Sequence, residues 1–182
     1  MPIKTWKGVI MQELKVMISE EEITKRVKEI AAQINKDYSG KELKLICLLK
    51  GSIFYTVELS KYLTMPVKFD FMTVSSYGSG TKSSGHVKIK KDLDESIEGQ
   101  HVLVIEDIID SGRTLSELLP LLKEKKPASL KLTTLLDKPA RREFDVDVDY
   151  VCFEIPDKFI VGYGLDYDQA YRNLPYIAEI VE

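Results

Sequence analysis

The sequence predicts an α/β fold in which a mainly parallel twisted sheet is flanked by helices. Short apolar runs of strand length alternate along the chain with amphipathic segments of helical period. The 182 residues fit one domain and can bury a full core. No internal repeat and no Pro- or Gly-rich linker divides the chain, so we expect a single domain over residues 1–182. Its core would span about 19–153, and the segments 1–18 and 154–182, which do not fit the alternation, would form a small hood.

The N-terminal half begins with the clearest predicted helix. Ser19 and Glu22 have the spacing of a capping box, and the apolar side chains of residues 19–38 fall on one helical face. The near-continuous apolar run 43–49 predicts a strand that is covered on both faces. Further expected elements are a helix within 53–63, a strand over 67–76 from the alternation of Val67, Phe69, Phe71 and Thr73, and a strand over 86–93.

The C-terminal half continues the alternation. Residues 101–106 predict a buried strand, and residues 114–126 predict an amphipathic helix. Pro120 fits that helix only in its first turn or at a kink. Further strands are expected over 129–137, 148–153 and 158–164.

Composition excludes several classes of protein. The net charge of −3 argues against a general nucleic-acid binder. The longest strictly apolar run, 45–49, has five residues, so no membrane span is expected, and the N-terminus lacks the apolar stretch of a signal peptide. Cys47 and Cys152 lie in apolar runs and are expected to be buried, reduced thiols. The two histidines are far apart and have no cysteine neighbours, which argues against zinc. We therefore expect a cytoplasmic protein.

Three unusual loops follow apolar strands. They are 50–52, 106–114 and 137–142. In an open parallel sheet, ligands bind outside the carboxyl ends of the strands, and all three loops would lie along that edge. Their convergence predicts a ligand site there.

The second half of loop 106–114 has the residues of a phosphate site. Ser111, Gly112 and Thr114 stand just before a predicted helix, whose first N–H groups can hold a phosphate. The spacing differs from a Walker A loop and from a Rossmann fingerprint. An ordinary turn with a Ser or Thr cap remains the alternative for these residues alone, but the acids ahead of them favour a phosphate site.

Glu106 and Asp107 open the same loop. Adjacent side chains of an extended chain point opposite ways, so we expect the chain to bend at the strand end, where both acids can reach hydroxyls or a metal. A solvated acidic turn is the alternative, although the apolar pair Ile108–Ile109 counts against it. A ribose phosphate would satisfy the loop, with its hydroxyls on the carboxylates and its phosphate near Ser111. The acids would also stabilise positive charge on the sugar.

The segment "VLVIEDIIDSGRTL" resembles the phosphoribosyl-pyrophosphate signature of the purine phosphoribosyltransferase family. The stretches "LLKGS", "DFMTVSSYGSG", "LLDKPARR" and "FEIPDKFIVGYGLDYDQAYRNLPYI" are similar to its bacterial hypoxanthine-guanine phosphoribosyltransferase type. The resemblance implies a type I phosphoribosyltransferase-like fold. It also implies purine salvage, with transfer of the 5-phosphoribosyl group from phosphoribosyl pyrophosphate to hypoxanthine or guanine to give IMP or GMP.

The resemblance implies a role for each position of the signature. Asp110 would be the general acid/base at the five-membered ring of the purine. Glu106 and Asp107 would hold the ribose hydroxyls and, with Asp166, would be candidate ligands of Mg²⁺. Whether the first two bind the metal or only the ribose stays open. The 5-phosphate would be bound by Ser111, Gly112, Arg113 and Thr114.

The pyrophosphate and purine sites are implied in the same way. Lys50 and Gly51 would bind pyrophosphate through backbone N–H groups, with a non-proline cis peptide entering Lys50, and Arg172 would contact it too. Lys138 would contact the exocyclic oxygen of the purine, although a lysine after a strand is usually just solvated. The remaining purine-site residues would be Phe159, which stacks on the base, Ile160, which offers backbone groups, and Asp166, which also helps hold Mg²⁺-pyrophosphate through water.

The stretch 75–85 is rich in serine and glycine. It is either a flexible loop without a task or a lid that shields the reacting sugar from water, with Ser76 and Tyr77 at its working end. The family resemblance favours the lid.

Partners follow from the same resemblance. The substrates would be phosphoribosyl pyrophosphate, hypoxanthine and guanine, with neither nucleic acid nor membrane, and the chain would form a homodimer or homotetramer. A xanthine-preferring transferase and a non-catalytic nucleotide-sensing regulator remain alternatives. A receiver-like signalling module is disfavoured, because its acids should follow the first strand and here they lie past residue 100.

Overall fold

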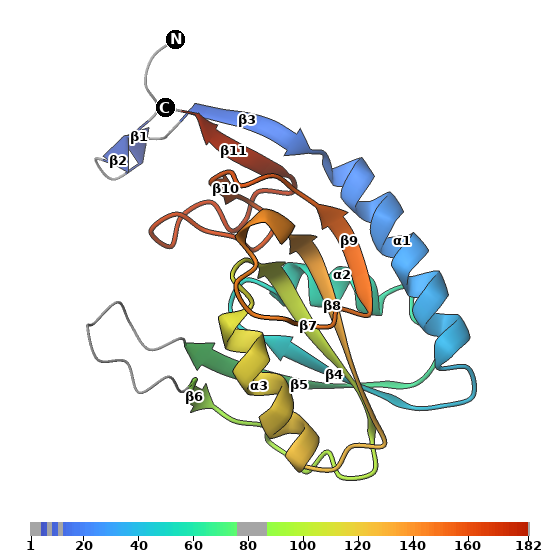
Figure 1. Ribbon diagram of the computed structural model, residues 1–182. Coiled ribbons are helices and arrows are strands. Elements are labelled where there is room, and N and C mark those ends of the chain that lie inside the picture. The colour runs from blue at the N-terminus through green and yellow to red at the C-terminus, as the bar shows by residue number, and fades with distance from the viewer. Residues whose placement is uncertain (1–4, 7–8, 11–12, 76–86, 182) are drawn as a thin grey trace.

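A central sheet of six strands organises the protein. The computed structural model describes residues 5–6, 9–10, 13–75 and 87–181. The strand order is β6-β5-β4-β7-β8-β9, and every pair is parallel except β5 with β6 (Figure 1). The strands are β4 (Leu43–Leu48), β5 (Val67–Ser75), β6 (Lys88–Lys91), β7 (His101–Ile109), β8 (Ser129–Asp137) and β9 (Tyr150–Glu154). The predicted α/β fold class is confirmed.

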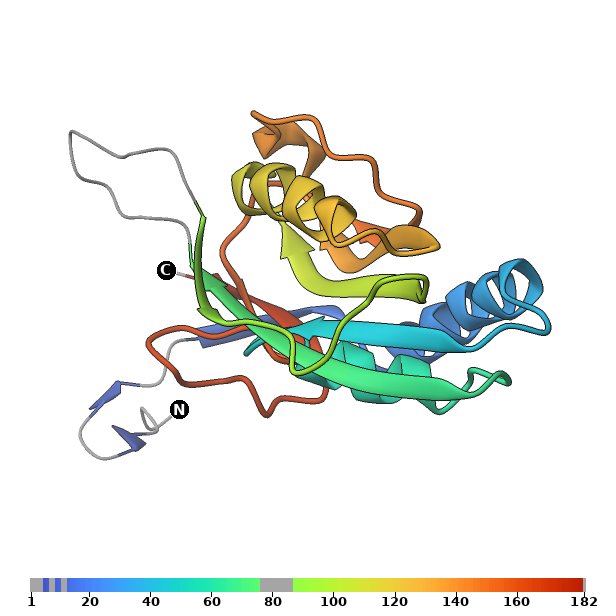
Figure 2. The same ribbon diagram turned by 90° about the horizontal axis from the view of Figure 1, so that it is seen from below.

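Helices cover both faces of this sheet. Residues of α1 (Glu20–Asp37) and α2 (Ile53–Ser60) share one buried cluster with one face of β4 and β7. The apolar side of α3 (Arg113–Glu124) packs on the opposite face, and Figure 2 shows α3 on the other side of the sheet from α2. All six residues of β4 are buried, as its apolar run predicts.

The capping-box prediction for the first helix is confirmed. The Ser19 side chain accepts from Glu22 N, and the Glu22 carboxylate accepts from Ser19 N. Among the described residues, no helix combines the length and the apolar character needed to cross a bilayer. Cys47 and Cys152 are buried free thiols, as expected.

Both terminal segments of the chain meet in a small antiparallel sheet. Its order is β10-β11-β3, with β3 (Glu13–Ile18), β10 (Ile160–Val161) and β11 (Ile177–Val181). A separate pair joins β1 (Thr5–Trp6) and β2 (Val9–Ile10), and a short 3-10 helix, η1 (Pro139–Arg141), follows β8. The three-stranded sheet lies beyond the carboxyl ends of β7 and β8 (Figure 1).

One expected strand is much shorter than predicted. The strand expected over 158–164 keeps only Ile160–Val161 and belongs to the small sheet. The strand expected over 67–76 is confirmed as β5, in which Phe69 is 45% exposed and the opposite face buries Met72 and Asp70. Asp70 is tolerated there because Lys44 Nζ lies 3.3 Å from its Oδ2. Pro120 lies in the interior of α3, which rules out the first turn, one of the two placements expected for it.

Candidate active site

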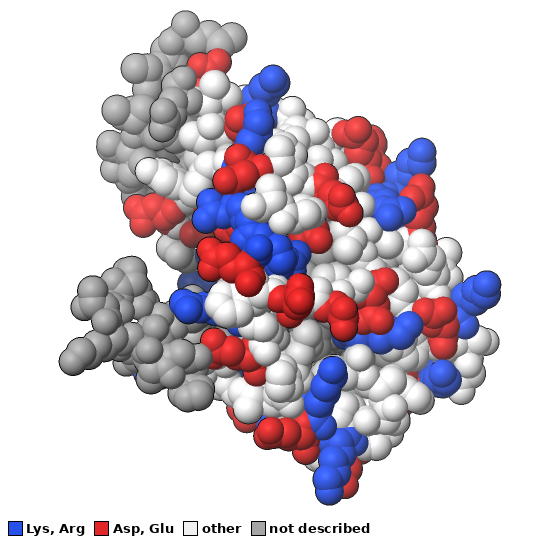
Figure 3. Space-filling view, in the orientation of Figure 1, with Lys and Arg blue, Asp and Glu red and all other residues white. Residues whose placement is uncertain are grey.

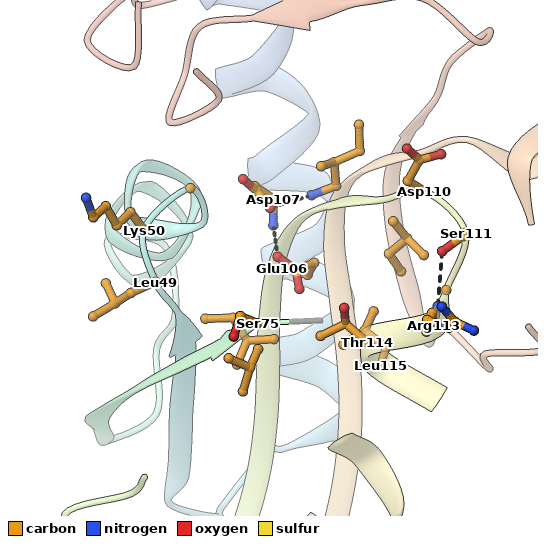
Figure 4. Close-up of a pocket in the computed structure, with 16 residues that line it drawn as sticks. Leu49, Lys50, Ser75, Glu106, Asp107, Asp110, Ser111, Arg113, Thr114 and Leu115 are labelled. Atoms are coloured by element: carbon orange, nitrogen blue, oxygen red, sulfur yellow. Dashed lines mark hydrogen bonds between the residues drawn. The ribbon is translucent and has the colours of Figure 1, made fainter. Parts of the chain in front are cut away.

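The predicted loops do converge on one edge of the sheet. Strands β4, β7 and β8 are parallel neighbours, so the loops after them leave the same side. A cleft of about 370 Å³ opens there, a size typical of small-molecule sites. It is lined by residues 48–51, 74–75 and 106–115 (Figure 4). The third loop, 137–142, adjoins the cleft through Arg141, which contacts Asp110.

Glu106 and Asp107 lie within strand β7, and the bend expected at Glu106 is wrong. The parallel ladder with β8 continues through Ile108 and Ile109, so the strand ends three residues later. Each carboxylate accepts from the next backbone N–H, Glu106 from Asp107 N at 3.1 Å and Asp107 from Ile108 N at 2.9 Å. The two side chains therefore leave the strand in different directions, as Figure 4 shows.

Glu106 is the electrostatically unusual acid of the cleft. Burial raises its pKa well above the ordinary value, and the neighbouring Asp107 carboxylate raises it further. The folded protein therefore holds a proton on Glu106 at pH values where an exposed glutamate has lost it. A cation or a hydroxyl donor entering the cleft would favour the charged form.

The phosphate loop, residues 111–114, joins β7 to α3. Gly112 caps the helix with φ +81°, a left-handed conformation that favours glycine, and α3 begins at Arg113. Ser111 O accepts from the backbone N–H groups of Glu143 and Phe144, both at 3.0 Å. The turn is thus held by main-chain bonds. Arg113, Thr114 and Leu115, the first residues of the 12-residue helix, line the cleft, and Arg113 N donates to Ser111 Oγ at 3.4 Å.

The loop after β4 packs directly on the acids. The Leu49–Lys50 peptide bond is cis, as expected. A Cβ added at Gly51 would lie 1.5 Å from Asp107 Oδ2, so only glycine permits this approach. A Cβ at Gly164 would lie 1.9 Å from Gly51 O, which places the segment after β10 against the other side of the same loop.

A set of polar side chains links Lys50 to that segment. Lys50 Nζ donates to Gln169 Oε1 at 3.1 Å. Arg172 donates to Gly164 O at 2.7 Å and forms an ion pair with Asp166 at 2.9 Å. The predicted residues Lys50, Arg172 and Asp166 are therefore brought together, and Gln169, which the sequence reasoning did not select, connects them.

Three of the predicted purine residues, Lys138, Phe159 and Ile160, belong to the two segments that the Arg141–Asp157 pair joins to Asp110. Lys138 is buried, donates to Lys158 O at 2.7 Å and lies 3.7 Å from Asp157 Oδ1. It is therefore not the solvated lysine of the alternative interpretation. Phe159 is 56% exposed and its ring packs edge-to-face with Tyr167, with centroids 5.5 Å apart, whereas Ile160 is buried in β10. Ser76 and Tyr77 lie outside the described residues.

The carboxylates fit Mg²⁺ only together with other ligands. In the described parts of the chain, no group of three His, Cys, Asp or Glu side chains is placed to hold a metal. Asp166 is instead paired with Arg172. Glu106 and Asp107 do line the cleft with hard oxygen atoms, and Mg²⁺ usually binds one or two carboxylates plus phosphates and water.

Arg141 and Asp157, which form ion pairs next to the cleft, were not selected from the sequence. Arg141 Nε lies 2.7 Å from Asp110 Oδ1, and Arg141 Nη1 lies 3.4 Å from Asp157 Oδ1. The sequence offered little signal for them, because the pairs join residues 31 and 16 positions apart.

The chain is similar to proteins of known family. Residues 18–168 match the sequence model of the phosphoribosyl transferase domain. The hypoxanthine-guanine phosphoribosyltransferase of Streptococcus thermophilus (strain CNRZ 1066) is 51% identical over 168 residues, which cover 92% of this chain and 93% of that protein. The Bacillus subtilis (strain 168) protein of the same name is 54% identical over 163 residues, 90% of this chain and 91% of that protein.

Solved structures show the same similarity. A crystal structure of a Bacillus anthracis hypoxanthine-guanine phosphoribosyltransferase, with a HEPES molecule in the active site, has a TM-score of 0.88 at 49% identity. It covers 93% of this chain and 100% of that chain. A mutant hypoxanthine phosphoribosyltransferase from Trypanosoma cruzi in a ternary substrates complex has a TM-score of 0.87 at 43% identity, with 93% of this chain and 96% of that chain covered.

Proposed function

The chain belongs to the phosphoribosyl transferase domain family, and on that premise we propose that it is a hypoxanthine-guanine phosphoribosyltransferase of purine salvage. It transfers the 5-phosphoribosyl group from phosphoribosyl pyrophosphate to hypoxanthine or guanine and gives IMP or GMP and pyrophosphate. One observation carries this proposal. Asp107, Asp110, the phosphate loop and the loop at Lys50 line a single cleft, with the purine residues beyond Asp110.

The substrates would extend from the phosphate loop, through the cleft, to Lys138 outside the cleft lining. The first N–H groups of α3, with the hydroxyls of Ser111 and Thr114, bind the 5-phosphate. Asp107 and Glu106 accept hydrogen bonds from the ribose hydroxyls and stabilise positive charge on the ring as the bond breaks. Lys50, Gly51 and Arg172 hold the pyrophosphate beside the loop that follows β4.

In the transfer step, the bond from the anomeric carbon to the pyrophosphate oxygen breaks, and its electron pair leaves with pyrophosphate. A purine ring nitrogen forms the new bond to that carbon. Asp110 takes the proton that the five-membered ring loses. Mg²⁺, held by the carboxylates of the cleft and by substrate phosphates, would neutralise charge on the departing group.

Lys138 would select the base. Its ammonium group has donors and no acceptor, so it suits the exocyclic oxygen of hypoxanthine or guanine and not the amino group of adenine. Its Nζ is already oriented by Lys158 O at 2.7 Å. Phe159 would stack on the ring, and Ile160 would offer backbone groups to its edge.

A pyrophosphate-release assay with four bases tests the function. Hypoxanthine and guanine should support release, and adenine should not. Release with xanthine alone would identify a xanthine-preferring transferase. Absence of release with every base, in the presence of Mg²⁺ and phosphoribosyl pyrophosphate, would refute the transferase and favour a nucleotide-sensing role.

Assembly and location are part of the same proposal. Two buried free thiols suit a reducing cytoplasm. On the described part of the face in Figure 3, acidic and basic side chains are intermixed, which does not favour nucleic acid as a partner. Ile53, Phe54 and Val57 expose apolar surface on α2, which favours a homodimer or homotetramer. Light scattering of the purified protein measures that state.

A further inference from the structure

A cation from the loop after β8 holds the proposed proton acceptor. Arg141 ends η1, and its Nε lies 2.7 Å from Asp110 Oδ1, a buried oxygen that accepts no hydrogen bond from the described residues, so the contact is an ion pair. Both side chains are about half exposed, at 50% and 47%. The contact uses one carboxylate oxygen of Asp110, and the second oxygen remains available to a ligand.

The other end of the same guanidinium contacts the purine side. Arg141 Nη1 lies 3.4 Å from Asp157 Oδ1, and Lys138 Nζ lies 3.7 Å from that same oxygen. Asp157 comes two residues before Phe159. A continuous line of charged contacts therefore runs from Lys138 through Asp157 and Arg141 to Asp110.

The backbone around Asp110 is fixed independently of Arg141. Glu143 and Phe144 each donate a backbone N–H to Ser111 O at 3.0 Å, and Lys138 N donates to Ile109 O at 2.9 Å. The main chain on both sides of Asp110 is thus tied to the segment after β8. What these bonds leave free is the rotation of the Asp110 side chain, which is half exposed and would otherwise sample several rotamers.

We propose that Arg141 is a positioning residue that fixes the Asp110 carboxylate for proton transfer and couples its orientation to the purine segment through Asp157. This inference rests on the proposed transferase function. A guanidinium suits the role, because its separate nitrogen atoms pair with two carboxylates at once, Asp110 through Nε and Asp157 through Nη1. A small misplacement of a reacting group can lower a rate by up to about 10²-fold, which sets the scale of the effect.

Single substitutions give the first test. Arg141→Ala should lower kcat about 10- to 100-fold, with the KM for phosphoribosyl pyrophosphate within about twofold because the phosphate loop is untouched. Arg141→Lys should recover part of kcat, since it restores the charge but not the two-sided contact. Lys68→Ala is the matched control, because Lys68 and Glu42 form an ion pair at 2.8 Å with similar exposure, 57% and 50%. Its kcat should equal that of the wild type.

The decisive measurement places Arg141→Ala in the Asp110→Asn background. If Arg141 acts through Asp110, the second substitution should lower the residual kcat by less than about twofold. If the double variant instead loses kcat relative to Asp110→Asn by the same factor that Arg141→Ala loses relative to the wild type, Arg141 does not act through Asp110 and the inference is overturned. An unchanged kcat in Arg141→Ala alone would overturn it as well.

Asp157→Asn tests the coupling. It should lower kcat less than Arg141→Ala does, and the two losses should not multiply in the double variant. Fully multiplicative losses would remove Asp157 from the proposed line of contacts. Thermal midpoints of all variants should stay near that of the wild type, because half-exposed ion pairs contribute little stability. A wild-type chain without transfer activity would instead refute the proposed function, so the two failures are distinguishable.

Discussion

The two sides of the cleft are built by different means. The sugar-phosphate side, residues 106–115, consists of a strand paired with β8 and a helix start, with Ile109 and Leu115 buried in the core. The base side, residues 157–172, consists largely of turns, with positive φ at Asp168, Gln169 and Tyr171 and side-chain pairs such as Arg172 with Asp166. Secondary structure thus fixes the side that would hold the ribose phosphate. Main-chain bonds within turns and side-chain ion pairs hold the other side, which would carry Phe159 for the base and Arg172 for pyrophosphate. Single substitutions of its exposed side chains should therefore alter binding before they alter the fold.

The largest effect should come from the sugar-phosphate side. Asp110→Asn should lower kcat about 10²- to 10⁴-fold, because an amide does not accept the purine proton. Calorimetry should show unchanged affinity for phosphoribosyl pyrophosphate. Asp92→Asn is the control, since Asp92 is a half-exposed partner of Lys125. If Asp110→Asn has the kcat of the wild type, Asp110 does not take part in proton transfer.

A substitution at Lys138 should weaken binding of the purine and leave binding of phosphoribosyl pyrophosphate unchanged. Lys138→Ala should raise the KM for hypoxanthine about 10- to 100-fold, because it removes a charged hydrogen bond worth about 1.5–3 kcal/mol. Affinity for phosphoribosyl pyrophosphate should stay within about twofold, since Lys138 does not line the phosphate cleft. Lys125→Ala, on the surface, should change neither value. If purine affinity and selectivity are both intact, the assignment of Lys138 is incorrect.

The two sides of the cleft meet at Gly51, which contacts Asp107 on one side and Gly164 on the other. In Gly51→Ala the added Cβ meets Asp107 Oδ2, so either the acid or the loop must move. We expect a loss of about 1–3 kcal/mol of unfolding free energy and higher KM values for both substrates, in contrast to Lys138→Ala. Gly99→Ala meets no atom within 4 Å and should change stability without changing either KM. If Gly51→Ala has the KM values of the wild type, the close contact of Gly51 with Asp107 is not needed for substrate binding.

The smallest effect concerns the pH dependence of stability. Burial raises the pKa of Glu106, so between its unfolded and its folded pKa the folded chain holds a proton that the unfolded chain has lost. The contribution of Glu106 to the free energy of unfolding is therefore fully present below its unfolded pKa. It decreases as pH rises toward the folded pKa, by at most about 1.4 kcal/mol per pH unit. Urea titrations from pH 5 to 8 should show Glu106→Gln gaining stability relative to the wild type as pH rises. The exposed control Glu98→Gln should show no such trend, and parallel curves for Glu106→Gln and wild type would contradict the expectation.

Elements with a local signal were well predicted. The capping box of Ser19 and Glu22 predicted the first helix, and the strand over 129–137 matches β8 residue for residue. The strand β7 was ended too early, because its two acids suggested a loop, whereas the ladder to β8 keeps them extended. The strands β3 and β11 were missed, since each is stabilised by a partner more than 150 residues away in the chain.

The sequence by itself determined the α/β class, the phosphate loop and the family resemblance, because strand and helix periods and short motifs depend on residues close together in the chain. Only the tertiary structure decided that Gly51 rests on Asp107, that Gln169 reaches Lys50, and that Arg141 holds Asp110. These contacts join loops from different strands, and their distances are set by how the sheet and the small antiparallel sheet pack together. Local sequence patterns contain no measure of that packing.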